Sequence, residues 1–158
     1  MKKRLISIAM AAVMAVGSIP AAGALLDGFN NTSTYSDQFT DVPSTAWYYN
    51  SVKSAYELGI TAGTSASKFS PDQNLTTNQL TVFLARIHAA YHHNEIVEVQ
   101  NPSSWTDKYY YYVEQYIDSS YRDSIFGGMD HEQRWHFAYW ISKALPDSAY
   151  TCLLYTSD

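Results

Sequence analysis

His88 and His92 have the spacing that most resembles a metal site in this sequence. Residues four apart on a helix lie on one face, and two histidines placed in this way can begin a zinc site. No Glu lies between them, unlike in the His-Glu-x-x-His arrangement. Exposed histidines near a helix end are the simpler interpretation, and we therefore expect no metal.

Patterns that would support catalysis are also lacking. The sequence contains no Ser/His/Asp nucleophile motif, and no two carboxylates stand out as an acid–base pair. The charged residues 130–132 beside Arg134 fit the first turn of a helix. The single Cys152 excludes an internal disulfide. We expect neither an enzymatic activity nor a cofactor.

Aromatic residues are abundant, with 14 Tyr, 4 Trp and 6 Phe. Each can bury a large apolar area, so together they can supply much of a core. The run from Tyr109 to Tyr112 must wrap around a helix, with some rings packed and others facing outward. Such a run could serve as a carbohydrate platform, but core packing with surface coverage is the simpler interpretation.

The elements that must position these side chains are helices. Four segments carry apolar residues at helical spacing and predict amphipathic helices. Their stripes are Tyr48, Val52, Ala55 and Tyr56; Leu80, Phe83, Leu84 and Ile87; Tyr109, Val113, Tyr116 and Ile117; and Phe137, Trp140, Ile141, Ala144 and Leu145. Thr76 or Thr77 can cap the second helix, with Gln79 at capping-box distance from Thr76. No strand pattern stands out, which indicates a mainly α fold.

The predicted helices form two similar pairs. Gly59 ends the first helix of pair one, and Gly127 that of pair two, because glycine permits the left-handed backbone that ends a helix. Trp47 and Trp105 stand before the first helix of each pair. The second pair has the longer first helix. One pair alone buries little surface, so we predict repeated helix-loop-helix modules packed as a small helical bundle.

Residues 1–24 have the pattern of a secretory signal peptide. Three basic residues precede an apolar stretch, and small residues follow it. The stretch is short for a bilayer and is interrupted by Gly17 and Pro20, so we expect cleavage and no membrane span afterwards. Cleavage removes three cations and changes the net charge from −5 to −8. A protein with this negative net charge repels the phosphates of nucleic acids, so we expect no nucleic-acid partner.

The segment from Phe39 to Arg86 resembles the S-layer homology family of bacterial surface proteins. Modules of this family read Phe-x-Asp-Val, a Trp, a helix ending in Gly-Ile, a Gly turn and Phe-x-Pro, followed by a second helix near Ile-Thr-Arg-Ala-Glu. This chain supplies, in order, Phe39, Asp41, Val42, Trp47, Gly59, Ile60, Gly63, Phe69, Pro71, Leu75, Thr76, Leu84, Ala85 and Arg86. We interpret residues 39–92 as one module and 104–146 as a degenerate second one.

The other segments follow from these bounds. Residues 25–38 and 93–103 are interpreted as linkers, and residues 147–158 as a tail that reflects a truncation or a sequencing artefact.

The resemblance implies secretion and non-covalent attachment to the bacterial cell wall. Modules of this family usually occur in threes and form a prism whose grooves bind pyruvylated secondary cell-wall polysaccharide. Two modules imply an incomplete prism, and other surface-layer proteins are further expected partners.

The ligand chemistry of the family is only partly kept. Its Thr-Arg-Ala-Glu motif becomes residues 76–79 here, where Thr77 replaces the Arg, and a hydroxyl cannot grip a carboxylate as a guanidinium does. Arg134 keeps an Arg at the equivalent place in the second module. It is therefore the first candidate for ligand binding, and an exposed surface charge is the alternative.

Three further residues are ligand-binding candidates by the same resemblance. Trp47 and Trp105 have faces that can stack against sugar rings, although core packing between helices is the more ordinary role. Asp41 belongs to the family motif, although a role as a cap or turn acceptor explains it better.

Three functions remain as hypotheses. The first is an exported, non-catalytic module that anchors a protein to the envelope by binding wall polysaccharide. The second is a structural or protein-interaction domain without glycan binding, which the loss of the Arg at position 77 favours. The third is the anchoring fragment of a longer exported enzyme such as a glycan hydrolase.

Overall fold

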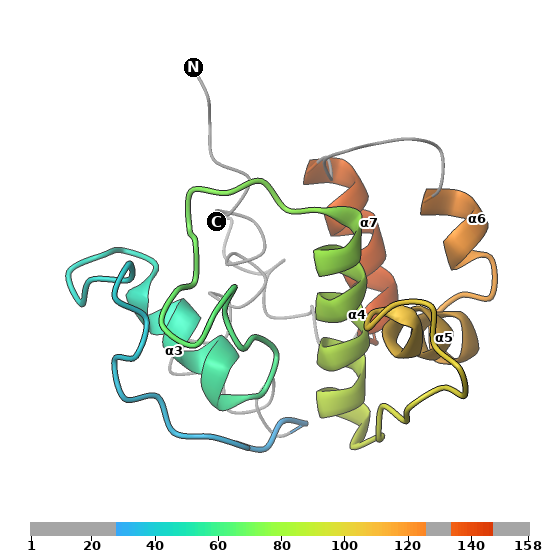
Figure 1. Cartoon of the computed structure of the whole chain (residues 1–158), viewed down its shortest axis with the longest axis horizontal. Helices are drawn as coiled ribbons and strands as arrows, with labels where there is room; N and C mark the ends of the chain where they lie inside the picture. Colours follow the sequence, from blue (N-terminus) through green and yellow to red (C-terminus); the bar gives the residue numbers. More distant parts are fainter. Residues whose placement is uncertain (1–27, 126–133, 147–158) are drawn as a thin grey trace, which may run out of the picture.

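The computed structural model describes residues 28–125 and 134–146, and these residues form helices and loops. The helices, labelled as in Figure 1, are α3 (Tyr49–Glu57), α4 (Thr77–His92), α5 (Asp107–Tyr116), α6 (Tyr121–Ile125) and α7 (Arg134–Ala144). Within these residues the only β pairing is the isolated bridge between Ser65 and Lys68. The prediction of a mainly α fold is confirmed.

Helix α4 is the central element of the bundle. It packs against α5 and α7, and α5 in turn contacts α6 (Figure 1). The most deeply buried side chains of this core include Leu80, Leu84, Val113 and Trp140, each at most 1% exposed. The same cluster contains Ala55 of α3, so the two predicted helix pairs share one core. The three-lobed prism of the family stays a prediction.

Short-range chemistry sets the start of α4. The hydroxyl of Thr76 accepts a hydrogen bond from the N–H of Gln79 at 3.3 Å, while the Gln79 side chain accepts one from the N–H of Thr76 at 2.9 Å. This reciprocal pair is a capping box, which satisfies two donors that the helix leaves unpaired. Of the two threonines proposed from the sequence, Thr76 is the cap.

Two glycines shape the loop after α3. Gly59 has φ +73° and ends the helix, as predicted. Gly63 has φ +80°, and a Cβ there would lie 2.5 Å from the Phe39 ring. The loop therefore turns back tightly against the start of the module.

The second helix pair differs from the prediction of one longer first helix. The helical segment ends at Tyr116, and a separate short helix, α6, starts at Tyr121. Between them the carboxylate of Asp118 accepts hydrogen bonds from the N–H and the hydroxyl of Ser120, at 2.9 and 2.6 Å. Side chains of this kind compete with the helical backbone pattern, which explains the break.

The segment interpreted as the first linker packs on the first module where it is described. Tyr35 is 7% exposed and shares an aromatic cluster with Phe39, and the N–H of Thr32 donates to the carbonyl of Glu57 at 2.8 Å. The predicted signal peptide, Gly127 and the tail at 147–158 lie outside the described residues. No helix among the described residues is long and apolar enough to span a bilayer.

Candidate functional site

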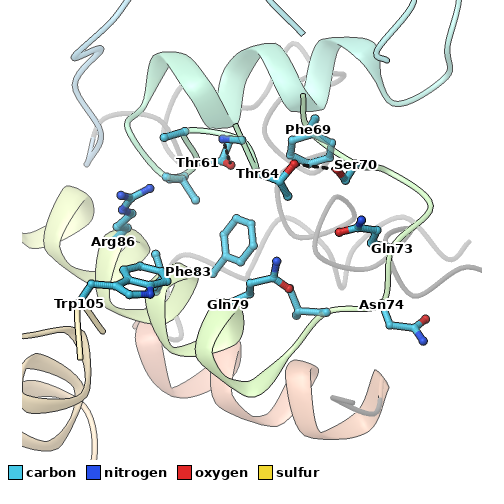
Figure 2. A pocket seen from close by; sticks show the side chains of 15 residues that line it. Thr61, Thr64, Phe69, Ser70, Gln73, Asn74, Gln79, Phe83, Arg86 and Trp105 are labelled. Carbon is cyan, nitrogen blue, oxygen red and sulfur yellow. Dashed lines mark hydrogen bonds between the residues drawn. The ribbon is translucent and has the colours of Figure 1, made fainter. Parts of the chain in front are cut away.

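A pocket of about 380 Å³ opens where the loops of the first helix pair meet α4 and the start of the second pair (Figure 2). Residues 60–64, 69–70 and 73–75 form the loop walls. One face of α4 supplies Gln79, Val82, Phe83 and Arg86. Trp105, just before α5, completes the lining. The pocket therefore depends on both helix pairs.

The interior of the pocket is mostly apolar. Phe69 and Leu75 of the loops and Val82 and Phe83 of α4 face it, each partly exposed to solvent. Small-molecule sites are typically apolar pockets with a few placed polar groups. These four apolar side chains, the floor of the pocket, would favour a ligand with an apolar face.

Polar groups lie around that floor. The hydroxyls of Thr64 and Ser70 are 2.7 Å apart, and Gln73 and Asn74 extend from the loop (Figure 2). The oxygen of the Gln79 side chain is used in the capping box, which leaves its amide N–H groups for a ligand. These hydroxyl and amide groups suit a ligand that carries several hydroxyls.

Arg86 brings a positive charge to one end of the pocket. It is half-buried, and its Nη2 donates to the Tyr109 hydroxyl at 3.2 Å. Within residues 28–125 and 134–146 no carboxylate forms an ion pair with Arg86. The planar, five-donor guanidinium matches a carboxylate, so this end of the pocket can receive an anion.

Trp105 stands beside Arg86 with its indole 68% exposed. Its ring meets Tyr109 edge to face, with centroids 6.1 Å apart. Trp105 offers a flat apolar surface, and Arg86 offers a charge that no carboxylate of the described residues neutralises. A ring-shaped acid, such as an acidic sugar, has both complementary features.

Comparison with known proteins finds a family similarity in the segment that contains α3 and the loop before α4. Residues 38–76 match the family model of the S-layer homology domain. This segment carries the S-layer homology signature. The chain is also 39% identical over 57 residues to an endoglucanase of Bacillus sp. (strain KSM-635), a match that covers 36% of this chain and 6% of the relative. No solved structure matches significantly.

The resemblance seen in the sequence is thus confirmed over residues 38–76, and the module bounds of 39–92 stay a prediction. S-layer homology domains are usually non-catalytic modules that attach proteins to bacterial cell walls, which implies a cell-surface role for the chain. The chain spans only a small part of the endoglucanase, so that protein's activity does not transfer to it. The degenerate module at 104–146 stays a prediction.

Asp41, from the S-layer homology signature, supports the pocket wall. Its carboxylate accepts hydrogen bonds from the N–H groups of Phe69 and Ser70, at 2.9 and 2.8 Å. Partial burial raises the pKa of Asp41, but these backbone donors outweigh it and leave that pKa below its usual value. The turn-acceptor interpretation is confirmed, and a direct ligand role stays a prediction.

The two tryptophans proposed from the sequence as ligand contacts differ in position. Trp105 lines the pocket, whereas Trp47 is 55% exposed, contacts Tyr48 edge to face and lies outside the pocket lining. Core packing between helices is therefore the wrong interpretation for both. The loop segments that precede α3 and α5 hold these rings at the surface instead of between helices.

Arg134 begins α7, and its side chain lies outside the described part of the structure. Thr77 does not line the pocket; its carbonyl accepts a hydrogen bond from the Thr81 hydroxyl at 2.9 Å. Position 77 thus carries no cation, and the cation that lines the pocket is Arg86, further along α4.

Sequence reasoning missed Arg86 as a site residue. It appeared only as the end of the family motif. A signal was present, because Gln79, Phe83 and Arg86 recur at i, i+4 and i+7 on a face beside the buried Leu80 and Leu84. This face of the helix presents an amide, an aromatic ring and a cation in turn, and a ligand could contact all three.

His88 and His92 lie ring against ring, with centroids 4.2 Å apart. The Nδ1 of His88 is 3.0 Å from the Tyr112 hydroxyl. Burial, and then the neighbouring His92, lowers the pKa of His88 to about 4. Within the described ranges no third His, Cys, Asp or Glu joins them as a ligand set.

Proposed function

We propose that this protein is exported and attaches non-covalently to the bacterial cell wall by binding an acidic wall polysaccharide in the pocket between its helix pairs. The observation that carries the proposal is the guanidinium of Arg86, which has no carboxylate partner among the described residues, together with the exposed indole of Trp105. The S-layer homology signature supports the wall as the place of binding.

The acidic group of the polymer is proposed to be a ketal-linked pyruvate. Its carboxylate would accept two parallel hydrogen bonds from a guanidinium, which is stronger and more directional than contact with a point charge. The sugar ring that carries it would lie against Trp105. The hydroxyl and amide groups of Thr64, Ser70 and Gln79 would then hold neighbouring hydroxyls.

A co-sedimentation experiment with purified cell walls tests this proposal. Wild-type protein should sediment with the walls, and Arg86→Gln should weaken binding about tenfold or more, the scale of one charge-assisted pair. Lys53→Gln, which removes an α3 cation outside the pocket lining, is the matched control and should bind normally. Equal binding by wild type and Arg86→Gln would remove Arg86 from the site.

Arg134 remains a second proposed contact, carried by its place in the degenerate module. Arg134→Ala should then weaken wall binding without changing the helical content. Undiminished binding would overturn this assignment while leaving Arg86 in place.

A second candidate function is the anchoring part of a longer exported enzyme, with other surface-layer proteins as neighbours. The similarity to an endoglucanase over only the module region favours it. Sequencing the gene beyond codon 158 tests this candidate. A structural domain without glycan binding would show the opposite pattern, with wall binding absent and self-association or partner capture retained.

A further inference from the structure

Tyr109 contacts both Arg86 and Trp105, the two residues at the cationic end of the pocket. Its hydroxyl lies 3.2 Å from Nη2 of Arg86, and its ring meets the Trp105 indole edge to face. It is itself 7% exposed and does not line the pocket. Tyr109 therefore lies behind the site and acts on a ligand only through its two neighbours.

The direction of the hydrogen bond is fixed by the chemistry of the two groups. A guanidinium only donates, so the phenol oxygen of Tyr109 accepts from Arg86. The Cζ atom of Arg86 also lies 5.5 Å from the centroid of the same ring, within cation–π range. Two attachments limit the rotation of the guanidinium before any ligand arrives.

A second cation on the same ring is compensated. The Lys108 ammonium lies 5.4 Å from the Tyr109 centroid and forms an ion pair with Glu98. The hydrogen bond that Lys108 donates to Glu98 raises the pKa of Lys108, so that charge is retained and already satisfied. Arg86 and Lys108 both contact Tyr109, and of this pair Arg86 is the one without a carboxylate partner in the described part of the chain.

Tyr109 also joins elements from the two helix pairs. Arg86 belongs to α4, whereas Trp105 and Tyr109 belong to the start of the second pair. Because one buried ring contacts both pocket residues, the distance between guanidinium and indole depends on Tyr109. Ordering these side chains in advance reduces the entropy lost on binding.

We propose that Tyr109 is a positioning residue that sets the preference of the pocket for acidic over neutral glycans, an inference that rests on the proposed function. The hydroxyl holds Arg86 for the acidic group, and the ring supports Trp105 for the sugar face. Removing only the hydroxyl should weaken the charge-dependent part of binding and leave the stacking part unchanged.

The first test compares binding to a pyruvylated wall polysaccharide with binding to the same polymer after its carboxyl groups are reduced to alcohols. Tyr109→Phe should bind the acidic polymer about three- to tenfold more weakly than wild type and the reduced polymer equally well. Tyr111→Phe, which removes the hydroxyl of a half-exposed ring on the same helix, should leave both affinities unchanged.

The second test needs no ligand. The rotation of the Arg86 guanidinium, measured by ¹⁵N NMR, should be slow in wild type and Tyr111→Phe and faster in Tyr109→Phe. If wild type binds no wall polymer but this change appears, the proposed function fails and the positioning role stands. If Tyr109→Phe alters neither the guanidinium rotation nor the preference for acidic polymer, the inference is overturned.

Discussion

The carboxylate of Asp41 accepts a hydrogen bond from the backbone N–H of Ser70 at 2.8 Å, although 29 residues separate the two along the chain. Ser70 lines the pocket and has φ +62°, a backbone conformation that few residues adopt without support. The same carboxylate also accepts from the N–H of Phe69. A residue of the family signature thus holds the pocket wall in place.

Replacing Asp41 should therefore destabilise the fold. Asp41→Ala leaves two backbone donors without an acceptor and should cost about 1–3 kcal/mol, measured by urea unfolding. Asp72→Ala, at an exposed position in the next turn, is the control and should change little. Because the folded-state pKa of Asp41 is lowered, its stabilisation is present above the unfolded pKa and is lost as pH falls through the folded pKa. A wild-type midpoint for Asp41→Ala would contradict this role.

The capping box at α4 gives a second prediction. Thr76→Ala removes the acceptor for the Gln79 N–H and should lower the free energy of unfolding by about 1 kcal/mol. Thr77→Ala is the matched control, since Thr77 accepts the Thr81 hydrogen bond through its backbone carbonyl, which the substitution keeps. Thermal or urea unfolding of the two variants distinguishes them, and equal losses would show that the cap is not at Thr76.

The lowered pKa of His88 leads to a prediction of how the stability of the fold depends on pH. Its pKa is about 4 in the folded state against 6.5 in the reference state, so the unfolded chain takes up a proton first on acidification. Its stabilising effect is complete above pH 6.5 and is lost as pH falls from 6.5 towards 4. Unfolding midpoints of His88→Gln should fall less over this range than those of wild type. His93→Asn, an exposed position with φ +55° that Asn tolerates, should behave like wild type. Parallel curves for wild type and His88→Gln would refute the buried, neutral state of His88.

Helical spacing was enough to predict the main elements of this fold. Leu80, Leu84 and Ile87 of the second stripe are buried in α4, whereas Phe83 is partly exposed in the pocket. The Tyr109–Tyr112 run packs three rings while Tyr111 stays half-exposed. The break between α5 and α6 was missed, because periodicity continues through Ile117 whereas local hydrogen bonds of Asp118 end the helix. The spacing of apolar residues shows which face of a helix is buried. It does not show where the helix ends when a side chain forms hydrogen bonds that interrupt the helical backbone pattern.

The site was harder to predict than the fold. The role of Asp41 as an acceptor followed from its residue type, but its partners, Phe69 and Ser70, depend on how the loop turns back at Gly63. Arg86 was not predicted as a site residue, because its role in the pocket depends on the presence of Trp105. The packing of the two helix pairs brings these two residues to the same pocket. No pattern within one segment contains that relationship.

The two exposed tryptophans should differ in function. Trp105→Ala removes an indole that lines the pocket and should weaken wall binding about tenfold, with little loss of stability because the ring is mostly exposed. Trp47→Ala removes a similarly exposed indole outside the pocket and should bind as wild type does. Isothermal titration with purified wall polysaccharide measures both. If Trp47→Ala loses more affinity than Trp105→Ala, the ligand lies elsewhere.

The most direct test of the central claim combines a change in the protein with a change in the polymer. Wild type and Arg86→Gln are each titrated with wall polysaccharide before and after removal of its pyruvyl groups. We expect tight binding only for wild type with the pyruvylated polymer, and no further loss when both changes are made, because each removes one partner of the same ion pair. Equal affinity of wild type and Arg86→Gln for the pyruvylated polymer would contradict the account.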